Sequence, residues 1–475
     1  MLFNSIEFVI FYIVVTTLYF LSPFKIRWLI LLIASCYFYM AFVPIYILIL
    51  GFTIVVDYFA GIYIERAQQK RKRKLLLTAS LVANIGILAV FKYYNFINLN
   101  LDYIFHKFNY HNPIPYLSIL LPIGLSFHTF QAMSYTIEVY RGNQKAEKHF
   151  GIYSLYVMFY PQLVAGPIER PQNILYQMHT KYPFSYNLMV SGLKLMLWGF
   201  FKKLVIADRL SIYVNSVFNN PDLHNGTSIA IASLFFAVQI YCDFSGYTDI
   251  AIGCAKTMGF DLMKNFNRPY FATNIQDFWR RWHISLSTWF RDYLYIPLGG
   301  SKVSTGRRYL NLFIIFLVSG IWHGANYTYI IWGALHGLYS VIYIIIKPYL
   351  RKTPENEFAA KLMRTGNIFI TIILVTFAWI FFRANSVADA FTLIGHLKSF
   401  GAKPFIGDGL SNFAHSLLAI FILFMVEYKM EYLPKKFNWF TSGNIFVRWG
   451  SIALTIFLLL LLGVFNGGQF IYFQF

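Results

Sequence analysis

The sequence is dominated by long apolar runs, each close to the length that a helix needs to cross a bilayer. A spanning helix takes about 20 largely apolar residues, and 57% of the chain is hydrophobic against 13% charged. One water-soluble core could not bury so much apolar surface. The pattern predicts an all-α integral membrane protein of roughly 11–12 membrane helices, in residues 6–22, 28–42, 45–64, 75–92, 116–138, 150–165, 190–206, 228–254, 327–346, 364–382, 413–428 and 449–465.

Basic residues gather between these runs. The net charge is +20, from 40 Lys and Arg against 20 Asp and Glu, with clusters at 25–27, 66–74, 141–148, 347–352 and 429–436. In a multi-pass protein such clusters mark cytoplasmic loops, so membrane lipids rather than nucleic acid are the expected partners. The same alternation places residues 466–475 on the outer side. We expect residues 1–475 to form one multispanning domain.

Residues 241–300 are too polar to span lipid and too aromatic for a free loop. Trp and Tyr residues are interleaved there with Arg280, Arg281 and Arg291, a composition that suits a helix at the level of the lipid headgroups. We therefore expect this stretch to lie in the membrane interface.

His323 ends the next apolar run, 309–322, in the sequence IWHGAN. Roughly 14 helical residues reach about 21 Å, whereas the hydrocarbon core is about 30 Å thick. The imidazole is therefore expected within the membrane, at a break before the helix 327–346. An ionisable residue at that depth is costly and indicates function, here as a general base. The alternative is a neutral histidine that is hydrogen-bonded between helices.

His283, in RRWHISLS, is the second candidate, either with a direct role or as a brace for the interfacial helix. His336 is predicted to pack against the site or to support it. No Cys pair or HExxH motif accompanies these histidines, so we expect no metal and no bound cofactor. The acidic residues that could orient either imidazole are Asp243, Asp249, Asp277 and Asp292.

Several segments resemble the membrane-bound O-acyltransferase family, and most closely its branch of bacterial alginate and other polysaccharide O-acetyltransferases. The resemblance is specific in FWRRWHISLSTWFRDYLYIPLGG (278–300) and GIWHGANYTYIIWGALHG (320–337), and extends to 121–142, 159–172 and 239–260. It implies a helical bundle with interfacial and re-entrant helices around a central tunnel, and a core motif region of about 115–346. It also implies that His323 and His283 are catalytic, with Asp292, Trp322, Asn326 and Trp282 as supporting residues.

The last residues, FIYFQF, have the form Phe-x-Tyr-x-x-Phe. They resemble an acyl-transfer tail of this branch, here 466–475, in which a tyrosine accepts the acyl group. The resemblance makes Tyr472 a candidate acyl relay. The alternative is an aromatic residue that anchors the last helix at the membrane surface.

The resemblance implies transfer of an acetyl group from a cytoplasmic thioester, with acetyl-CoA as donor, across a bacterial inner membrane for O-acetylation of an extracytoplasmic polysaccharide. An SGNH-type acetyltransferase outside the membrane would be the partner. Lys256, Lys264 and Arg268 could attract the donor's phosphates. Two alternatives remain open: D-alanyl transfer to teichoic acid from an acyl carrier protein, and transport of a polysaccharide precursor.

Overall fold

A computed structural model describes residues 1–118, 122, 124–164, 166–350, 354–407, 409–433, 440, 442–465 and 471. These residues form helices and connecting segments and contain no β-strand. The α-helices are α1 Ile6–Leu21, α2 Phe24–Met40, α3 Ile47–Arg66, α4 Lys70–Lys107, α5 Leu125–Arg141, α6 Phe150–Met158, α7 Tyr160–Leu163, α8 Pro171–Met178, α9 Tyr186–Phe200, α10 Asp208–Phe218, α11 Gly226–Thr257, α12 Ile275–Arg281, α13 Ile284–Phe290, α14 Thr305–His323, α15 Tyr327–Ile346, α16 Glu357–Arg383, α17 Val387–His396, α18 Leu410–Tyr432 and α19 Ile445–Leu462.

Shorter helical segments complete this description. Two are π-helices, η2 Phe201–Ala207 and η5 Arg291–Tyr295. The 3-10 segments are η1 Pro44–Tyr46, η3 Pro221–Leu223, η4 Pro269–Phe271, η6 Lys347–Tyr349 and η7 Leu397–Ser399.

Seven helices among the described residues are long and apolar enough to cross a membrane. The chain is therefore a multi-pass membrane protein. These helices are Pro44–Arg66, Lys70–Lys107, Gly226–Thr257, Tyr327–Tyr349, Glu357–Arg383, Leu410–Tyr432 and Ile445–Leu462.

Three predicted runs were wrong in extent or continuity, and one of them, 75–92, is only part of the 38-residue helix α4. The helix expected over 116–138 begins at Leu125, after Gly124 with φ +76°, and residues 116–118 are not helical. The run 150–165 is divided at Phe159 into α6 and α7. Pro161 accounts for this break, because proline has no N–H with which to continue the helical hydrogen bonds.

The helix that carries His323 is longer than its apolar run suggested. α14 has 19 residues, because Thr305 to Arg308 join its first turn, and it extends about 28 Å. Measured from Arg308, His323 lies 15 residues along the helix, or about 22 Å. If the arginine marks the interface, the imidazole still lies within the thickness of a bilayer.

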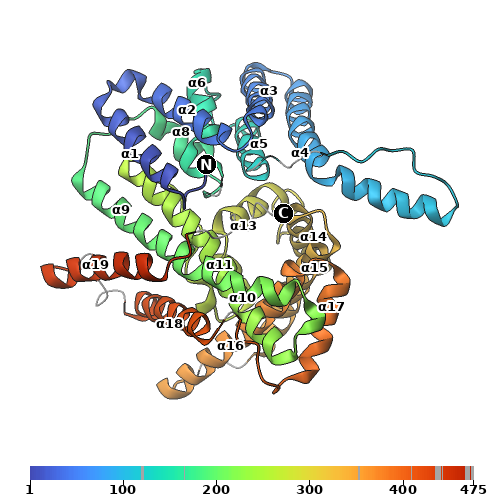
Figure 1. The fold of residues 1–475 in the computed structure, drawn as a ribbon. Helices are drawn as coiled ribbons and strands as arrows, with labels where there is room; N and C mark the ends of the chain where they lie inside the picture. The colour runs from blue at the N-terminus through green and yellow to red at the C-terminus, as the bar shows by residue number, and fades with distance from the viewer. Residues whose placement is uncertain are drawn as a thin grey trace. The chain divides into compact units, whose positions relative to one another are not determined.

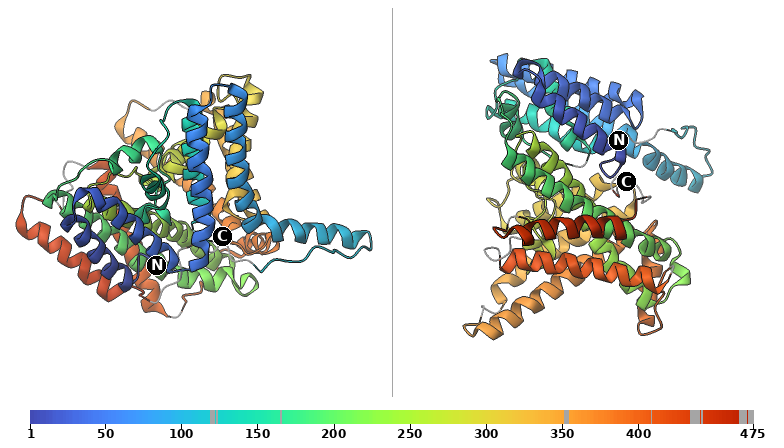
Figure 2. Two further views of the ribbon diagram at one scale, coloured as in Figure 1. Left: turned by 90° about the horizontal axis from the view of Figure 1, so that it is seen from above. Right: turned by 60° about the vertical axis from the view of Figure 1, so that its left-hand side comes forward.

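The chain forms two compact units, residues 1–196 with 248–263, and residues 197–247 with 264–475. In the first unit, α3 and α4 run side by side (Figure 2). Between them the buried Asp57 carboxylate accepts hydrogen bonds from Asn84 Nδ2 at 3.1 and 2.9 Å and from Ser80 Oγ. A carboxylate between membrane helices is thus satisfied by neighbouring side chains.

In the second unit, α14 and α15 form a tightly packed antiparallel pair (Figure 1). A methyl group at Gly320 would lie 2.3 Å from the Tyr329 carbonyl oxygen, and one at Gly333 would lie 2.4 Å from that of Phe316. Glycine is therefore required at both positions for this approach, as at many contacts between membrane helices.

We expect Gly320→Ala to lower the thermal unfolding midpoint in detergent, because the added methyl group forces the two helices apart. Overpacking of this kind costs about 1–3 kcal/mol. Gly366→Ala is the matched control, because Gly366 is exposed in α16 and no atom lies within 4 Å of the added methyl group. Alanine there should leave stability unchanged or raise it by up to about 1 kcal/mol. Equal midpoints for the two variants would contradict the close-packing interpretation.

Candidate active site

His323 is the last residue of α14 and is 5% exposed. Its ring centroid lies 4.8 Å from Trp322, 5.0 Å from Trp332 and 5.2 Å from Phe382, and the Trp332 ring stands perpendicular to it. The imidazole thus has aromatic walls on several sides. Such walls exclude water, which strengthens electrostatic interactions at the ring.

His283 lies between α12 and α13 with φ +43°, in the left-handed region that side-chain-bearing residues seldom occupy. Asn265 holds this turn. Its backbone oxygen accepts from the Ile284 N–H at 2.9 Å, and its Oδ1 accepts from Ser285 N–H at 3.2 Å and Ser285 Oγ at 2.9 Å. The unusual backbone at His283 is therefore supported from a loop 18 residues earlier.

Asn265 also determines the tautomer of His283. Because a backbone N–H donates to Oδ1, this amide atom is the oxygen, and it lies 3.1 Å from His283 Nδ1. The imidazole must then donate from Nδ1, which leaves the lone pair on Nε2. Burial lowers the pKa of His283 to about 3, so the ring is neutral near physiological pH.

The ring of Trp322 is close to both predicted catalytic histidines. Its ring centroid is 6.5 Å from that of His283 and 4.8 Å from that of His323. The structure therefore brings together the RWH and WHG segments, which are 40 residues apart in sequence.

His336 lies on α15 and is fully buried. Its Nδ1 is 3.3 Å from Trp279 Nε1, which donates to it, and its ring is 5.0 Å from Trp332. Trp332 therefore stands against both His323 and His336. This position is compatible with the supporting role predicted for His336.

The other predicted supporting residues lie at the edges of the centre. Trp282 is buried and packs on Trp379 at 5.2 Å. Asn326 caps α15 by accepting from the Thr328 N–H at 3.0 Å, and it donates to the Asn385 carbonyl at 3.0 Å. Asp292 forms an ion pair with the exposed Arg291 at 2.7 Å.

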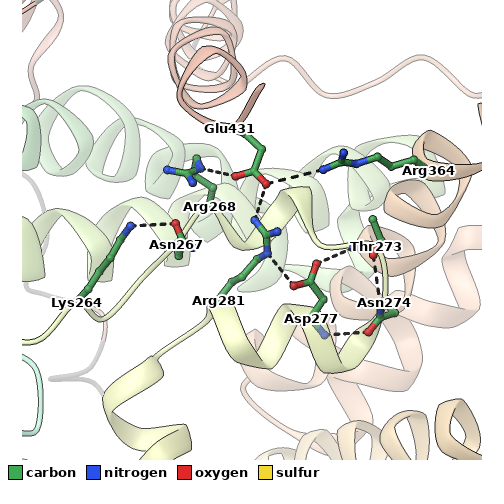
Figure 3. A network of polar contacts seen from close by, with 9 residues as sticks. All are labelled: Lys264, Asn267, Arg268, Thr273, Asn274, Asp277, Arg281, Arg364 and Glu431. Carbon is green, nitrogen blue, oxygen red and sulfur yellow. Dashed lines mark hydrogen bonds and ion pairs between the residues drawn. The ribbon is translucent and has the colours of Figure 1, made fainter. Parts of the chain in front are cut away.

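Glu431, near the end of α18, is the centre of an arginine cluster (Figure 3). It accepts from Arg268 Nε at 2.6 Å and from Arg281 Nη1 at 2.9 Å, and Arg364 lies at 4.0 Å. Arg281 also pairs with Asp277 at 2.9 Å. Asp277 and Arg268, proposed above for imidazole orientation and for phosphate binding, thus form ion pairs that hold the RRWH segment in place.

The remaining predicted residues lie elsewhere. Lys264 bonds to Asn267 at 2.9 Å, and Asp243 pairs with Lys203 at 2.6 Å. Asp249 and Lys256 belong to the first compact unit. Tyr472 lies outside the described residues.

A pocket of about 640 Å³ lies between α12–η5 and the α14/α15 pair. Apolar side chains such as Leu312, Ile315 and Ile344 line it, together with Arg280, Arg291, Arg308 and Lys347. None of the described residues in its lining is acidic. Its wall includes Ser319, one helical turn before His323, and Trp279, the hydrogen-bond partner of His336.

Sequence reasoning missed Asn265 and the functional difference between two adjacent arginines. Asn265 is part of no motif with a recognisable spacing. Arg281 belongs to the Glu431 cluster, whereas Arg280 lines the pocket and has no ion-pair partner among the described residues. Only the three-dimensional placement of each side chain separates the two arginines.

Residues 149–388 match the sequence model of the MBOAT, membrane-bound O-acyltransferase family. The chain belongs to this family. The match contains His283, His323 and most of the surroundings just described. The protein is therefore an O-acyltransferase, and the family resemblance recognised in its motifs is confirmed.

Among its relatives is a protein of Pseudomonas aeruginosa described as "Probable alginate O-acetylase AlgI", 38% identical over 81% of this chain and 72% of the relative. The "Peptidoglycan O-acetyltransferase" of Helicobacter pylori is 35% identical over 77% of this chain and 72% of the relative. The "Teichoic acid D-alanyltransferase" of Bacillus subtilis is 28% identical over 66% of this chain and 78% of the relative.

We expect Asn265→Ala to lower kcat by about 10–100-fold, by analogy with loss of the hydrogen-bond partner that orients a metal-bound histidine. KM for the acyl donor should change little, because the pocket is left intact. Asn265→Asp keeps the acceptor and should restore part of kcat. It should also shift the pH–rate profile upward, because its charge favours imidazolium. Asn267→Ala is the control for the same loop. An unchanged kcat in Asn265→Ala would exclude this positioning role.

Proposed function

We propose that this protein transfers acetyl groups from cytoplasmic acetyl-CoA across a bacterial inner membrane, for O-acetylation of an extracytoplasmic polysaccharide. The observation that carries the proposal is the basic pocket whose wall reaches within one helical turn of His323. The similarity to an alginate O-acetylase and a peptidoglycan O-acetyltransferase supports acetyl as the acyl group and a glycan as the final acceptor.

The pocket has the chemistry of a site for an anionic thioester. Arg280, Arg308 and Lys347 have no acidic partner among the described residues, and arginine binds phosphate through charge-assisted hydrogen bonds. The apolar side chains along α14 suit the uncharged arm of coenzyme A. Arg308 and Lys347 also lie at the end of the α14/α15 pair next to the basic loop 347–352, which is predicted to be cytoplasmic.

His323, one helical turn beyond Ser319 of the pocket wall, would act as general base. It takes the proton from an attacking hydroxyl while the hydroxyl oxygen forms a bond to the thioester carbonyl carbon. The tetrahedral intermediate then breaks its C–S bond. The departing thiolate takes the proton from the imidazolium and leaves as a thiol. The aromatic walls around His323 keep water from competing with the hydroxyl.

Tyr472 is the proposed first acceptor. A phenol has a pKa near 10 and needs a base to attack, and its acetyl ester is reactive enough to pass the acetyl group on. An SGNH-type acetyltransferase outside the membrane would then complete transfer to the polymer. This relay role rests on the sequence form of the tail.

D-alanyl transfer to teichoic acid is the second candidate, favoured by the similarity to the Bacillus subtilis D-alanyltransferase. The acyl donor distinguishes the two candidate functions. Acetyl transfer uses coenzyme A, whereas the alternative requires an aminoacylated carrier protein.

Incubation of the purified chain with radiolabelled acetyl-CoA should place label on Tyr472. His323→Ala should reduce labelling by at least about 100-fold, because the attacking hydroxyl loses its base, and Tyr472→Phe should abolish labelling of the tail peptide. Mass spectrometry of the digested protein locates the acetyl group. Wild-type polymer acetylation by Tyr472→Phe would refute the relay. Absence of label with intact substrate movement would favour transport instead.

The pocket assignment makes a separate prediction. Combined Arg280→Ala and Arg308→Ala should raise KM for acetyl-CoA by about tenfold or more, because charge-assisted contacts to phosphate contribute about 1.5–3 kcal/mol. Activity with S-acetyl-N-acetylcysteamine, a thioester without phosphates, should stay near that of the wild type. Arg307→Ala is the matched control, since Arg307 is exposed and does not line the pocket. A larger effect in Arg307→Ala would rule out the assignment.

A further inference from the structure

The chain that follows α19 is attached to η2 and α10 of the second unit. Arg209 donates to the Leu462 carbonyl from Nη2 at 2.6 Å and from Nε at 3.2 Å. Two residues later, the Val464 N–H donates to the Leu204 carbonyl at 3.0 Å. The chain that leaves α19 is thus held by the Arg209 side chain of α10 and by the backbone of η2.

Ile471, the next described residue after Phe465, is attached as well. Its backbone N–H donates to Asp243 Oδ2 at 2.7 Å, and its side chain is buried. The other oxygen of Asp243 lies 2.6 Å from Lys203 Nζ, and Lys203 also pairs with Asp208 at 2.7 Å. All three charged side chains are at most 4% exposed.

The balance of charges explains why this amide is bound. Two buried carboxylates share one ammonium group, so Asp243 needs a further donor to offset its lost hydration. The Ile471 N–H supplies that donor. Release of Ile471 would leave a buried carboxylate oxygen without this hydrogen bond, which favours the attached state.

Asp243 also lies next to the active-site wall. The following residue, Phe244, places its ring 4.6 Å from that of His283. Consecutive residues of α11 thus contact the tail and the histidine centre. The π-helix that carries Lys203 is of a rare type that occurs often at functional sites.

We propose that Asp243, held by Lys203, is a positioning residue that anchors the tail at Ile471, the residue directly before the proposed acceptor Tyr472. The functional part of this inference rests on the proposed relay role of Tyr472. The anchoring part does not.

The test compares carboxypeptidase trimming of the tail in the full-length protein, followed by intact mass. Ile471→Pro removes the donating N–H and fixes φ at position 471, and leaves both ion-paired aspartates in place, whereas Ile471→Val keeps the N–H. Asp243→Ala removes the anchor, whereas Asp208→Ala removes the other partner of Lys203. We expect loss of the residues that follow Tyr472 at least about tenfold faster in Ile471→Pro and Asp243→Ala than in their controls.

Acetyl labelling of Tyr472 in the same variants separates the two parts. Faster trimming together with reduced labelling in Ile471→Pro supports the whole proposal. Faster trimming with no labelled tyrosine in any variant, the wild type included, supports the anchor and overturns the relay. Equal trimming in Ile471→Pro and Ile471→Val overturns the anchor, even if Tyr472 is acetylated. Because Ile471 lies in the tail, its variants keep the test decisive if Asp243→Ala does not fold.

Discussion

The close contact of α14 and α15 at Gly320 and Gly333 is the constraint on which the histidine centre depends. Apolar side chains gain little by leaving lipid for a helix interface, so membrane helices rely on close packing for their association. His323 follows Gly320 by three residues, and Trp332 directly precedes Gly333. Because glycine has no side chain at these two positions, the helices approach closely, and the ring centroids of His323 and Trp332 lie 5.0 Å apart.

The charged side chains of the second unit fall into two groups. Some form ion pairs within the protein, and others line the pocket, where a ligand could bind. Glu431 is shared by three arginines, and Lys203 is shared by two aspartates. Ionised groups near lipid persist when they are paired in this way. Within the described part of the chain, the basic residues of the pocket have no acidic partner, with Arg291 as the exception. An anionic ligand would provide a partner of opposite charge.

Sequence patterns predicted those helices that are determined by their own residues and caps. The run 327–346 coincides with α15, because a single uninterrupted apolar segment begins after the Asn326 cap. The motifs that contain His283 and His323 were recognised from the sequence, and the structure places both rings near Trp322. Interruptions of a helix were harder to predict. The run 150–165 is apolar throughout, so its composition gave no sign that the helix is interrupted near Pro161.

Features that depend on distant partners could not be predicted in this way. The tautomer of His283 depends on Asn265, and the need for glycine at position 320 depends on α15. Similarly, nothing in the pair Arg280–Arg281 reveals that one pairs with Glu431 while the other lines a pocket. Each of these is a property of a tertiary contact, for which periodicity carries no signal.

Asp243 and Phe244 are adjacent on α11, where Asp243 accepts from the Ile471 N–H and the Phe244 ring lies 4.6 Å from that of His283. One turn of helix therefore contacts both the end of the chain and the imidazole. A substitution that shifts the backbone of this turn would disturb both contacts at once.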